Sequence, residues 1–547
     1  MTLFDELYKP LIFAVFGFAS IFILNTAQAQ TAFNWTNGSG NSSWGTSTNW
    51  SSTSSGIPDS SSERAVFQDA SFTGNQVITL PSGTFTIAKL DFDSTAKNVS
   101  INGPGTLTFN NGSSSSQDIG FDSSSTGTLT INADILSTVK RTRFLNWSNN
   151  GASLVINGNI SNGGNEIMLS TVGAATTITI NGDISGSGNL KMQAQALGAG
   201  AATVASATTY TGTTNMRTGT LRLSGDGTLG DGTGTLDFTV STGAKSTLEL
   251  SNLNTTTIAN PFNIRDNGFG EAGAVHLSAG NATFSGDGTI ARRLADPKIV
   301  ADSGTNLGFT GAVTLSNTVT FEAAGDISTS GSGVFSGTGN VDKTGSGTLT
   351  YSGGANTYSG TTTITAGSFV MNTTGGDSVA GSELIVNGSA SATLSQSNQI
   401  GASTNLRLTG GSFNTGGFDE ALGTLILQDS SNFDLGSGDS VIEFTDSSAE
   451  SWTSGQTFLL LNWTGSLSGG GTDQVIFGTD SSGLTGGQDG QITFRDPFGL
   501  AAGDYSAQIL GTGEVVPVPE PSTYAIIFGL VAGGYILWMR KKRVKAA

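Results

Sequence analysis

Short strand-like runs recur along the chain about every two dozen residues, and this spacing limits the possible folds more than any other feature. Four runs align on Phe109, Ile131, Ile156 and Ile180, at spacings of 22, 25 and 24 residues. Within residues 177–180, Ile alternates with Thr, so apolar side chains lie on one face of a strand and hydroxyls on the other. This step is the length of one coil of a parallel β-solenoid, in which each coil buries its inner face against its neighbours. The sequence therefore predicts an all-β, elongated right-handed parallel β-helix.

The same rhythm returns late in the chain, where Leu384, Leu406 and Leu425 follow at steps of 22 and 19 residues. Asparagine ends several of the runs, as at Asn132 and Asn157. Asn tolerates left-handed φ and bonds its own backbone, so these positions suit bends between strands. Stacked Asn side chains can also form a ladder, which we expect inside the solenoid.

Composition supports this fold and excludes several others. The 547 residues include 79 Gly, 10 Pro and no Cys, without the Gly-X-Y period of collagen. A hydrophobic content of 36% is enough to build a core, so general disorder is not expected. Without disulfides, stability must come from backbone ladders and stacked apolar side chains. The net charge of −18 argues against nucleic acid as a partner and favours solubility or cation-bridged association with a matrix.

Residues 1–29 have the pattern of a signal peptide. An uncharged apolar run from Leu11 to Leu24 follows Lys9, and Ala27-Gln28-Ala29 fits an A-x-A cleavage site, with Ala27 and Ala29 as its small residues. An uncleaved N-terminal anchor remains the alternative. In either case the polar body lies outside the inner membrane.

Two aromatic groups are expected at the ends of the stack. Trp35, Trp44 and Trp50 lie close together after the signal segment. Indole faces can stack on sugar rings, or they can cover the open end of a β-stack, and we favour the cap. Residues 432–510 are a denser apolar and aromatic block that includes Trp452 and Trp463, and we interpret this block as a C-terminal β cap.

A second, longer repeat occurs twice. Thr209–Thr214 leads to Gly219 as Thr357–Thr362 leads to Gly367, with nine residues from Tyr to Gly in both copies. The fuller copy, near 339–372, resembles the autotransporter-associated β-strand repeat, and a degraded copy lies near 186–223. The resemblance implies a β-solenoid of the kind found on bacterial surface and secreted passenger domains.

The last thirty residues have three parts in a fixed order. Val518-Pro519-Glu520-Pro521-Ser522-Thr523 is stiff, because each proline fixes its own φ and disfavours helix in the residue before it. An uncharged apolar segment follows, and we expect a transmembrane helix over 524–540. The anchor residues expected in it are Tyr524, Phe528, Gly529, Gly533 and Trp538. The basic cluster that would hold the C-terminus in the cytoplasm is Arg540, Lys541, Lys542 and Arg543.

This order resembles the PEP-CTERM sorting signal of polysaccharide-producing Gram-negative bacteria. The resemblance implies that Val518, Pro519, Glu520, Pro521 and Ser522 form a sorting signal read by a membrane enzyme called exosortase. It further implies export to the cell surface or extracellular matrix. An ordinary single-pass anchor with a Pro-rich collar is the alternative.

Few residues are suited to catalysis. A catalytic triad or His metal site would depend on His276, the one histidine, and its strand-like surroundings favour a structural or exposed residue. The string from Gly225 to Gly230 matches G-x-G-x-x-G, but no helix pattern follows it, so we reject dinucleotide binding.

The remaining charged pairs favour a solvated surface. Asp91 and Asp93 alternate onto one strand face, as do Arg141 and Arg143, and nothing in the sequence brings the two pairs together. Asp226 and Asp231 could supply oxygen ligands to calcium, but neither loop has the spacing of a known calcium motif. We therefore expect no catalytic residue, no metal site and no cofactor.

These inferences combine into one expected organisation. The predicted segments are a signal peptide (1–29), N-terminal coils (30–205), coils with the autotransporter-type repeats (206–431), a C-terminal cap (432–510) and the sorting segment (511–547). The expected function is structural or adhesive at the cell surface or in the matrix. The expected partners are exosortase, exopolysaccharide or other glycans and the inner membrane. The alternatives are a polysaccharide lyase or hydrolase on the same scaffold and a released autotransporter-like passenger.

Overall fold

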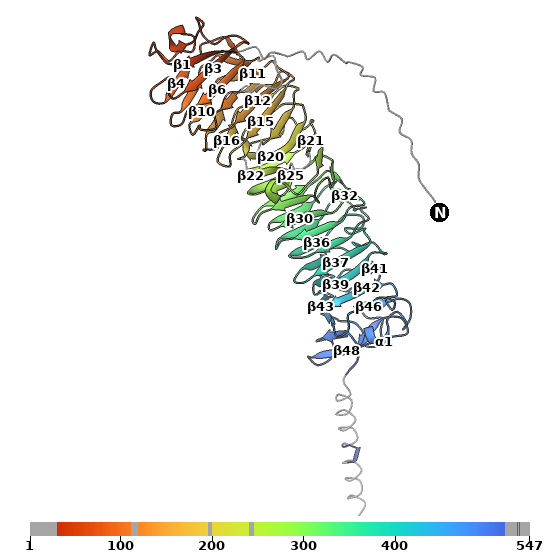
Figure 1. Ribbon diagram of the computed structural model, residues 1–547. Helices are drawn as coiled ribbons and strands as arrows, with labels where there is room; N and C mark the ends of the chain where they lie inside the picture. Colours follow the sequence, from red (N-terminus) through yellow and green to blue (C-terminus); the bar gives the residue numbers. More distant parts are fainter. Residues whose placement is uncertain are drawn as a thin grey trace, which may run out of the picture.

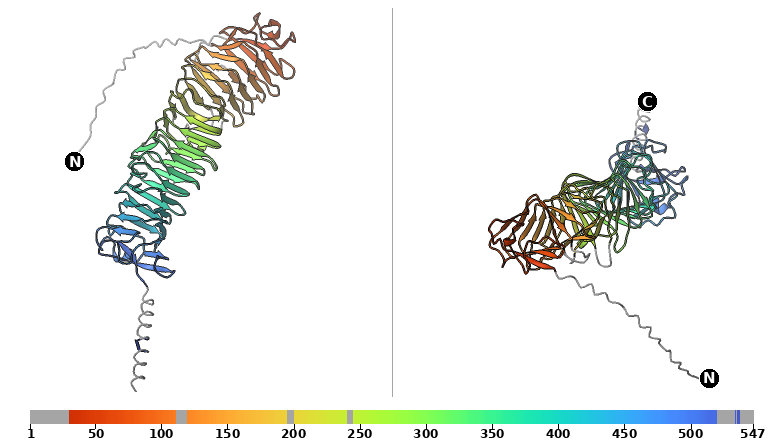
Figure 2. Two further views of the ribbon diagram at one scale, coloured as in Figure 1. Left: turned by 180° about the vertical axis from the view of Figure 1, so that it is seen from behind. Right: turned by 90° about the horizontal axis from the view of Figure 1, so that it is seen from above.

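The computed structural model describes residues 30–110, 119–194, 200–239 and 245–519, together with residues 533, 535 and 536. The described residues between 30 and 519 form an elongated parallel β-solenoid of about 16 turns, which confirms the predicted all-β stack (Figure 1). The first coils and β48 lie at opposite ends of the rod, as Figure 2 shows from two further directions. Helix in the described residues between 30 and 519 is limited to α1 (Gly486–Asp489) and the 3-10 turns η1 (Ser47–Asn49) and η2 (Phe269–Glu271).

Each coil contributes strands to up to three parallel ladders, which we call ladders 1, 2 and 3. The strands of ladder 1 are β1 (Thr31–Trp35), β3 (Glu63–Gln68), β6 (Lys89–Asp93), β9 (Ile119–Phe121), β12 (Arg141–Asn146), β15 (Glu166–Thr171), β18 (Leu190–Gln193), the first part of β20 (Thr214–Gly225), β21 (Leu236–Asp237), β23 (Phe262–Ile264), β26 (Gly288–Ile290), β29 (Ala312–Leu315), β32 (Val334–Gly337), β41 (Glu420–Leu422), β44 (Val441–Phe444) and β46 (Gln474–Phe477). Between β32 and β41 the ladder is reduced to isolated contacts such as the bridge Val379↔Ile400.

Ladder 2 follows ladder 1 in each coil. Its strands are β4 (Gln76–Thr79), β7 (Val99–Asn102), β10 (Thr128–Ile131), β13 (Ser153–Ile156), β16 (Thr177–Ile180), β19 (Ala202–Val204), the second part of β20, the first part of β22 (Ser246–Ile258), β24 (Val275–Leu277), β27 (Lys298–Ala301), β30 (Val319–Ala323), β33 (Val341–Thr344), β35 (Thr362–Ile364), β37 (Glu383–Asn387), β39 (Asn405–Thr409) and β42 (Leu425–Asp429).

Ladder 3 closes each coil. Its strands are β5 (Thr84–Ile87), β8 (Thr106–Phe109), β11 (Asp134–Ser137), β14 (Ile160–Ser161), β17 (Ile184–Ser185), the second part of β22, β25 (Gly280–Phe284), β28 (Asn306–Phe309), β31 (Asp326–Thr329), β34 (Thr348–Tyr351), β36 (Ser368–Met371), β38 (Ser391–Leu394), β40 (Ser412–Asn414), β43 (Ser431–Asp434), β45 (Phe458–Leu461) and β47 (Ile492–Arg495). Described strands pair continuously through 230–340, where the sequence spacing is irregular.

The core is a set of inward columns in which each apolar side chain lies on the next. In ladder 2, Ile131, Ile156 and Ile180 are register partners, as the sequence spacing predicts, and all three are fully buried. The alignment on Phe109 is wrong. Phe109 lies in ladder 3 opposite Ser137, whereas the partner of Ile131 is Ile101. The Thr-Leu-Thr-apolar pattern recurs on more than one face of a coil, so the pattern alone does not assign a strand to its ladder.

Asparagines do form a ladder, but it lies outside the solenoid and not within it. Asn157 Nδ2 donates to Asn132 Oδ1 at 2.6 Å, and Asn181 Nδ2 donates to Asn157 Oδ1 at 2.7 Å. All three side chains are exposed. Each of these asparagines follows the last inward residue of a ladder 2 strand. Successive side chains of a strand point to opposite faces, so the asparagine side chains point outward. The prediction of an internal ladder is therefore wrong in its location.

Many glycines lie at corners where coils approach most closely. A Cβ on Gly212 would lie 2.3 Å from the carbonyl oxygen of Gly188, and one on Gly234 would lie 1.9 Å from that of Gly212. The same contact recurs at Gly360 and Gly381, each stacked on a glycine of the coil before it. Gly212 and Gly234 precede ladder 1 strands, whereas Gly360 and Gly381 precede ladder 2 strands. The absence of a side chain at both corners therefore allows the coils to stack, which explains part of the glycine content.

Both ends of the stack are covered. Trp35 and Trp44 are completely buried and pack edge-on against Trp50, with ring centroids 4.9 and 4.8 Å from it. These indoles therefore cap the N-terminal end, and their burial excludes sugar stacking on them. Here β2 (Trp50–Ser51) pairs antiparallel with β1.

The C-terminal end closes with antiparallel pairing. β48 (Asp504–Ile509) pairs with β47, and β49 (Val515–Pro517) pairs with β48. Before this closure, β43 to β47 continue ladders 1 and 3. Regular structure thus continues past residue 511, where the sequence predicts that the sorting segment begins, and Val515 and Val516 are fully buried.

Several predicted features lie outside the described residues. These are the signal segment with Ala27 and Ala29, the sorting residues Glu520, Pro521 and Ser522, most of the expected helix 524–540, including Tyr524, Phe528, Gly529 and Trp538, and the basic cluster Arg540, Lys541, Lys542 and Arg543. Among the residues that the structure describes, no helix is long and apolar enough to span a bilayer.

Candidate functional site

A groove runs across the outer face of ladder 1 near the N-terminal end of the rod. It is a hollow of about 560 Å³ over β3, β6 and β9, and we call it the ladder 1 groove. The side chains important for its chemistry are Arg64, Lys89, Asp91, Asp93, Asp122 and Trp147. They come from four successive coils, so no short sequence motif contains them.

The shape of the groove follows from the register of ladder 1. Gly120 lies between Asp91 and Leu145 in an outward row, and it offers no side chain there. The outer surface of ladder 1 is therefore recessed next to Asp91. Trp147, the first residue after β12, lines the same hollow and is 46% exposed. An exposed indole beside a low floor is a platform on which a flat ligand face can stack.

Two carboxylates of the groove already have partners. Asp91 pairs with Arg64 at 2.8 Å and with Lys89 at 2.5 Å, so its charge is balanced. Asp122 accepts from the backbone N–H and the hydroxyl of Ser124, at 3.0 and 2.8 Å. Those bonds hold the pKa of Asp122 below its ordinary value.

Asp93 differs from both. In the described part of the chain its carboxylate has neither a hydrogen-bond donor nor a cation as partner. Its neighbour across the ladder is Asp122, because Phe92 and Phe121 are register partners and an aspartate follows each. Burial, and then the nearby carboxylates of Asp122, Asp69 and Asp91, raise the pKa of Asp93. The groove therefore holds one unneutralised acidic position beside an exposed indole.

Part of this site is visible in the sequence. Asp91 and Asp93 lie on one outward face, as expected, and the fold adds Asp122 and Trp147. A signal was available, since Phe92-Asp93-Ser94 and Phe121-Asp122-Ser123 repeat one motif about one coil apart. Arg141 of the second predicted pair forms an ion pair with Glu166, and Lys191 approaches the same carboxylate at 3.9 Å.

Other sequence candidates have structural partners. His276 Nε2 lies 3.1 Å from Asp302 Oδ2 on the outer face of ladder 2, which fits a surface histidine. Asp231 accepts from the N–H and hydroxyl of Thr233 at 2.9 and 2.6 Å, so it stabilises its own turn. Over the ranges that the structure describes, no group of three His, Asp or Glu residues is arranged to hold a metal ion.

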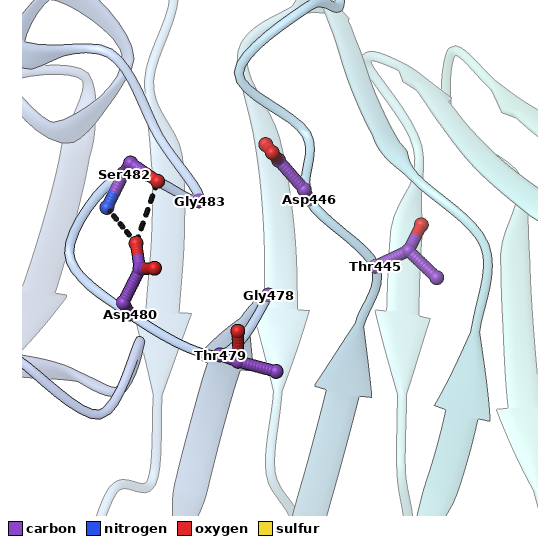
Figure 3. A pocket seen from close by; sticks show the side chains of 7 residues that line it. All are labelled: Thr445, Asp446, Gly478, Thr479, Asp480, Ser482 and Gly483. Atoms are coloured by element: carbon purple, nitrogen blue, oxygen red, sulfur yellow. Dashed lines mark hydrogen bonds between the residues drawn. The ribbon is translucent and has the colours of Figure 1, made fainter.

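A second, smaller hollow lies at the other end of the rod (Figure 3). It encloses about 300 Å³ between two turns of identical sequence, Thr-Asp-Ser-Ser at 445–448 and 479–482. Asp480 accepts from the N–H and hydroxyl of Ser482 at 2.7 and 2.5 Å, and Asp446 accepts from the N–H of Ser448 at 2.9 Å. These bonds lower the pKa of both carboxyls. The acceptors are thus used within their own turns, and no aromatic side chain lines the hollow.

The two copies of the longer repeat have the same local geometry. Tyr210 Oη lies 2.6 Å from Thr214 Oγ1, and Tyr358 Oη lies 2.6 Å from Thr362 Oγ1. Both tyrosines are buried, with 1% and 0% of their surface exposed. A hydroxyl pair four residues apart therefore satisfies each tyrosine inside the core.

The last described residues of the body belong to the expected sorting signal. Val518 N–H donates to the carbonyl oxygen of Ser506 at 2.8 Å, which extends the pairing of β48 and β49. Pro519 follows it and ends the continuous described range.

Part of the chain matches a known repeat family. The family model of the passenger-associated transport repeat matches residues 341–371, which contain β33 to β36. Searches among curated proteins and among solved structures gave no match. The matched repeat and the β-solenoid fold together fit a surface-exposed structural or adhesive protein.

Proposed function

We propose that this protein is an exported surface rod that binds glycans of the extracellular matrix through the ladder 1 groove. The observation that carries the proposal is the exposed indole of Trp147 beside charged side chains in one hollow. Sugar rings offer one apolar face and a rim of hydroxyls, so a ligand of this kind can use the indole face and the carboxylates together.

The rest of the surface supports an adhesive role. Its outward rows carry hydroxyls and amides, such as the ladder Asn132, Asn157, Asn181, which offer weak hydrogen bonds at regular steps. Many weak contacts along one rigid rod add up to avidity when the ligand is itself a polymer. Capped ends favour a discrete rod over a growing filament, because free strand edges are covered.

Export and retention belong to the same proposal. The tail resembles a PEP-CTERM signal, so we infer that exosortase reads Val518 to Ser522 and that the apolar segment after it holds the protein in the inner membrane before processing. Deleting 518–547 should redirect the protein from the cell envelope to the medium or periplasm. Unchanged retention in the envelope would exclude the tail as the sorting signal.

Glycan binding is tested with the purified full chain and a panel of matrix polysaccharides and their oligomers. Trp147→Ala should weaken binding about tenfold or more, as expected when an aromatic platform worth at least 1.4 kcal/mol is removed. Trp147→Phe is the matched control and should keep most of the affinity. Binding that is equal for the wild type and Trp147→Ala would place the glycan site elsewhere or nowhere.

A polysaccharide hydrolase is the second candidate. It is favoured by the contrast between Asp93, whose pKa is raised, and Asp122, whose pKa is lowered, in adjacent coils of one groove. Such a contrast suits an acid and an ionised carboxylate acting on one glycosidic bond. Release of reducing ends from any polysaccharide of the panel, lost in Asp93→Asn, would favour this candidate. Turnover that survives both Asp93→Asn and Asp122→Asn would place the chemistry at another site.

A further inference from the structure

The ladder 1 groove has an uneven charge distribution. At one side, the cations Arg64 and Lys89 are both held by Asp91, so neither is available to a ligand without breaking an ion pair. At the other side, Asp93 and Asp122 are adjacent carboxylates, and Asp93 lacks a partner among the described residues. Each of the two cations thus has Asp91 as its partner, whereas Asp93 has neither a hydrogen-bond donor nor a cation among the described residues.

We propose that the ladder 1 groove binds a glycan unit that carries a free amino group, with the ammonium group against Asp93 and Asp122 and the sugar ring against Trp147. The inference depends on the proposed glycan-binding function and specifies its ligand class. An ammonium group supplies up to three donors and one positive charge, which matches two adjacent carboxylates that have acceptor capacity left.

The same charges discriminate against other sugars. A uronate would bring a carboxylate next to Asp93 and Asp122, and like charges in close contact disfavour the wrong ligand. A neutral or N-acetylated sugar can donate hydrogen bonds to Asp93, but it leaves the paired negative charges unbalanced. A metal ion alone is a poorer fit, because the carboxylates of the described chain do not gather into a group of three ligands.

Neighbouring elements do not remove this charge. Asp69, at the end of the adjoining coil, accepts from the hydroxyl of Ser94 at 2.6 Å and from the N–H of Thr95 at 2.7 Å. Lys97 donates to the carbonyl oxygens of Asp69 and Phe72, at 2.5 and 2.7 Å, and its Nζ lies over the Phe72 ring. Lys97 also lies 3.9 Å from Asp69 Oδ1, so its ammonium group is engaged by backbone oxygens, an aromatic ring and that carboxylate.

The test measures binding of the full chain, by titration calorimetry, to four oligomers of matched length. They are a glucosamine oligomer, its N-acetylated form, a neutral glucose oligomer and a uronate oligomer. The expected result is at least about tenfold tighter binding of the glucosamine oligomer than of the N-acetylated form, the size of one charge-assisted contact. Asp93→Asn should remove this preference and leave binding of the N-acetylated form within about twofold.

A matched control separates the groove from general attraction to an acidic protein. Asp446→Asn removes an equal charge from the second hollow and should leave the preference unchanged. Loss of preference in both variants would overturn the inference, as would equal or tighter binding of the uronate. The inference would also be overturned if the wild type bound calcium ions in the absence of glycan and Asp93→Asn did not. That result would identify the groove as a metal site.

The two proposals fail differently. If none of the four oligomers binds, or if Trp147→Ala binds all of them as the wild type does, the glycan-binding function itself is wrong. If oligomers bind and Trp147→Ala weakens them, but Asp93→Asn changes nothing, only the amino-sugar preference is wrong.

Discussion

Replacing Lys343 by methionine should change how the stability of the solenoid depends on pH. Lys343 lies in an inward column of ladder 2, between Phe321 and Ile364, and none of its surface is exposed. Its Nζ donates to the carbonyl oxygens of Thr344, Gly345 and Ala366 at 3.1, 2.7 and 2.9 Å. A positive charge is thus held inside the apolar core, at the start of the matched repeat.

The magnitude follows from the pKa of this lysine. Burial lowers it from an ordinary value of 10.5 to about 8. One pKa unit corresponds to about 1.4 kcal/mol, so the shift represents roughly 3 kcal/mol. Between about pH 8 and 10.5 the unfolded chain binds more protons at this site than the folded chain. The free energy of unfolding therefore rises with pH through that window, and this contribution is constant below it.

The assay compares urea unfolding of the wild type and Lys343→Met from pH 7 to 10.5. The stability of the wild type relative to the variant should rise by roughly 3 kcal/mol across the window, while other titrating groups cancel in the difference. Met is close to Lys in length and suits an apolar column. The carbonyl oxygens left without a donor add an offset that does not change with pH.

Two controls make the result specific. Lys140→Met removes an exposed lysine from the same rod and serves as the matched control for loss of charge. Coils of a solenoid can unfold separately, so hydrogen exchange of amides in β33 and β35 reports the local effect. A difference between wild type and Lys343→Met that stays constant from pH 7 to 10.5 would refute the reasoning.

Three further changes probe the cap, the corners and a buried acid. Trp44→Ala should destabilise the rod by about 3–5 kcal/mol and cause end-to-end association in light scattering, whereas exposed Trp147→Ala should do neither. Gly381→Ala should lower the melting temperature because its Cβ would lie 1.7 Å from a carbonyl oxygen of the coil before it, and Gly486→Ala, with nothing within 4 Å, should not. Burial raises the pKa of Glu420 to about 8, so the folded chain binds the extra proton from about pH 4.5 to 8. Wild-type stability relative to Glu420→Gln should therefore fall as pH rises through that window, which denaturation at pH 5 and 8 measures; equal differences at both would contradict it.

Periodicity identified the stack because inward residues must meet their counterparts one coil away. Ile131, Ile156 and Ile180 are partners for that reason, and Leu384, Leu406 and Leu425 are partners in the same ladder. The same reasoning failed at Phe109, whose run has the pattern of a ladder 2 strand but lies in ladder 3. Apolar and polar residues alternate with a period of two in the strands of all three ladders. Only the connections between strands therefore distinguish one ladder from another.

The candidate site was harder to predict than the fold. Asp91 and Asp93 are visible as an outward pair, but Asp122 joins them through the register of Phe92 and Phe121, and Trp147 joins them from the loop after β12. Sequence spacing between these residues has no fixed value. Their proximity depends on how each loop leaves and rejoins the stack, which a repeat pattern does not describe.

The location of both hollows has a physical reason. The segments from ladder 1 to ladder 2, such as 122–127 and 147–152, are longer than those from ladder 2 to ladder 3, such as 132–133 and 157–159. The backbone of a short connecting segment must stack closely on the same segment of the next coil. A longer loop can accept different side chains without disturbing the inward columns of the core. The ladder 1 groove and the hollow of Figure 3 both lie where ladder 1 strands end. Substitutions in the loops that line the two hollows should therefore alter ligand binding at little cost in stability, whereas substitutions of stacked glycines such as Gly212 or Gly381 should do the reverse.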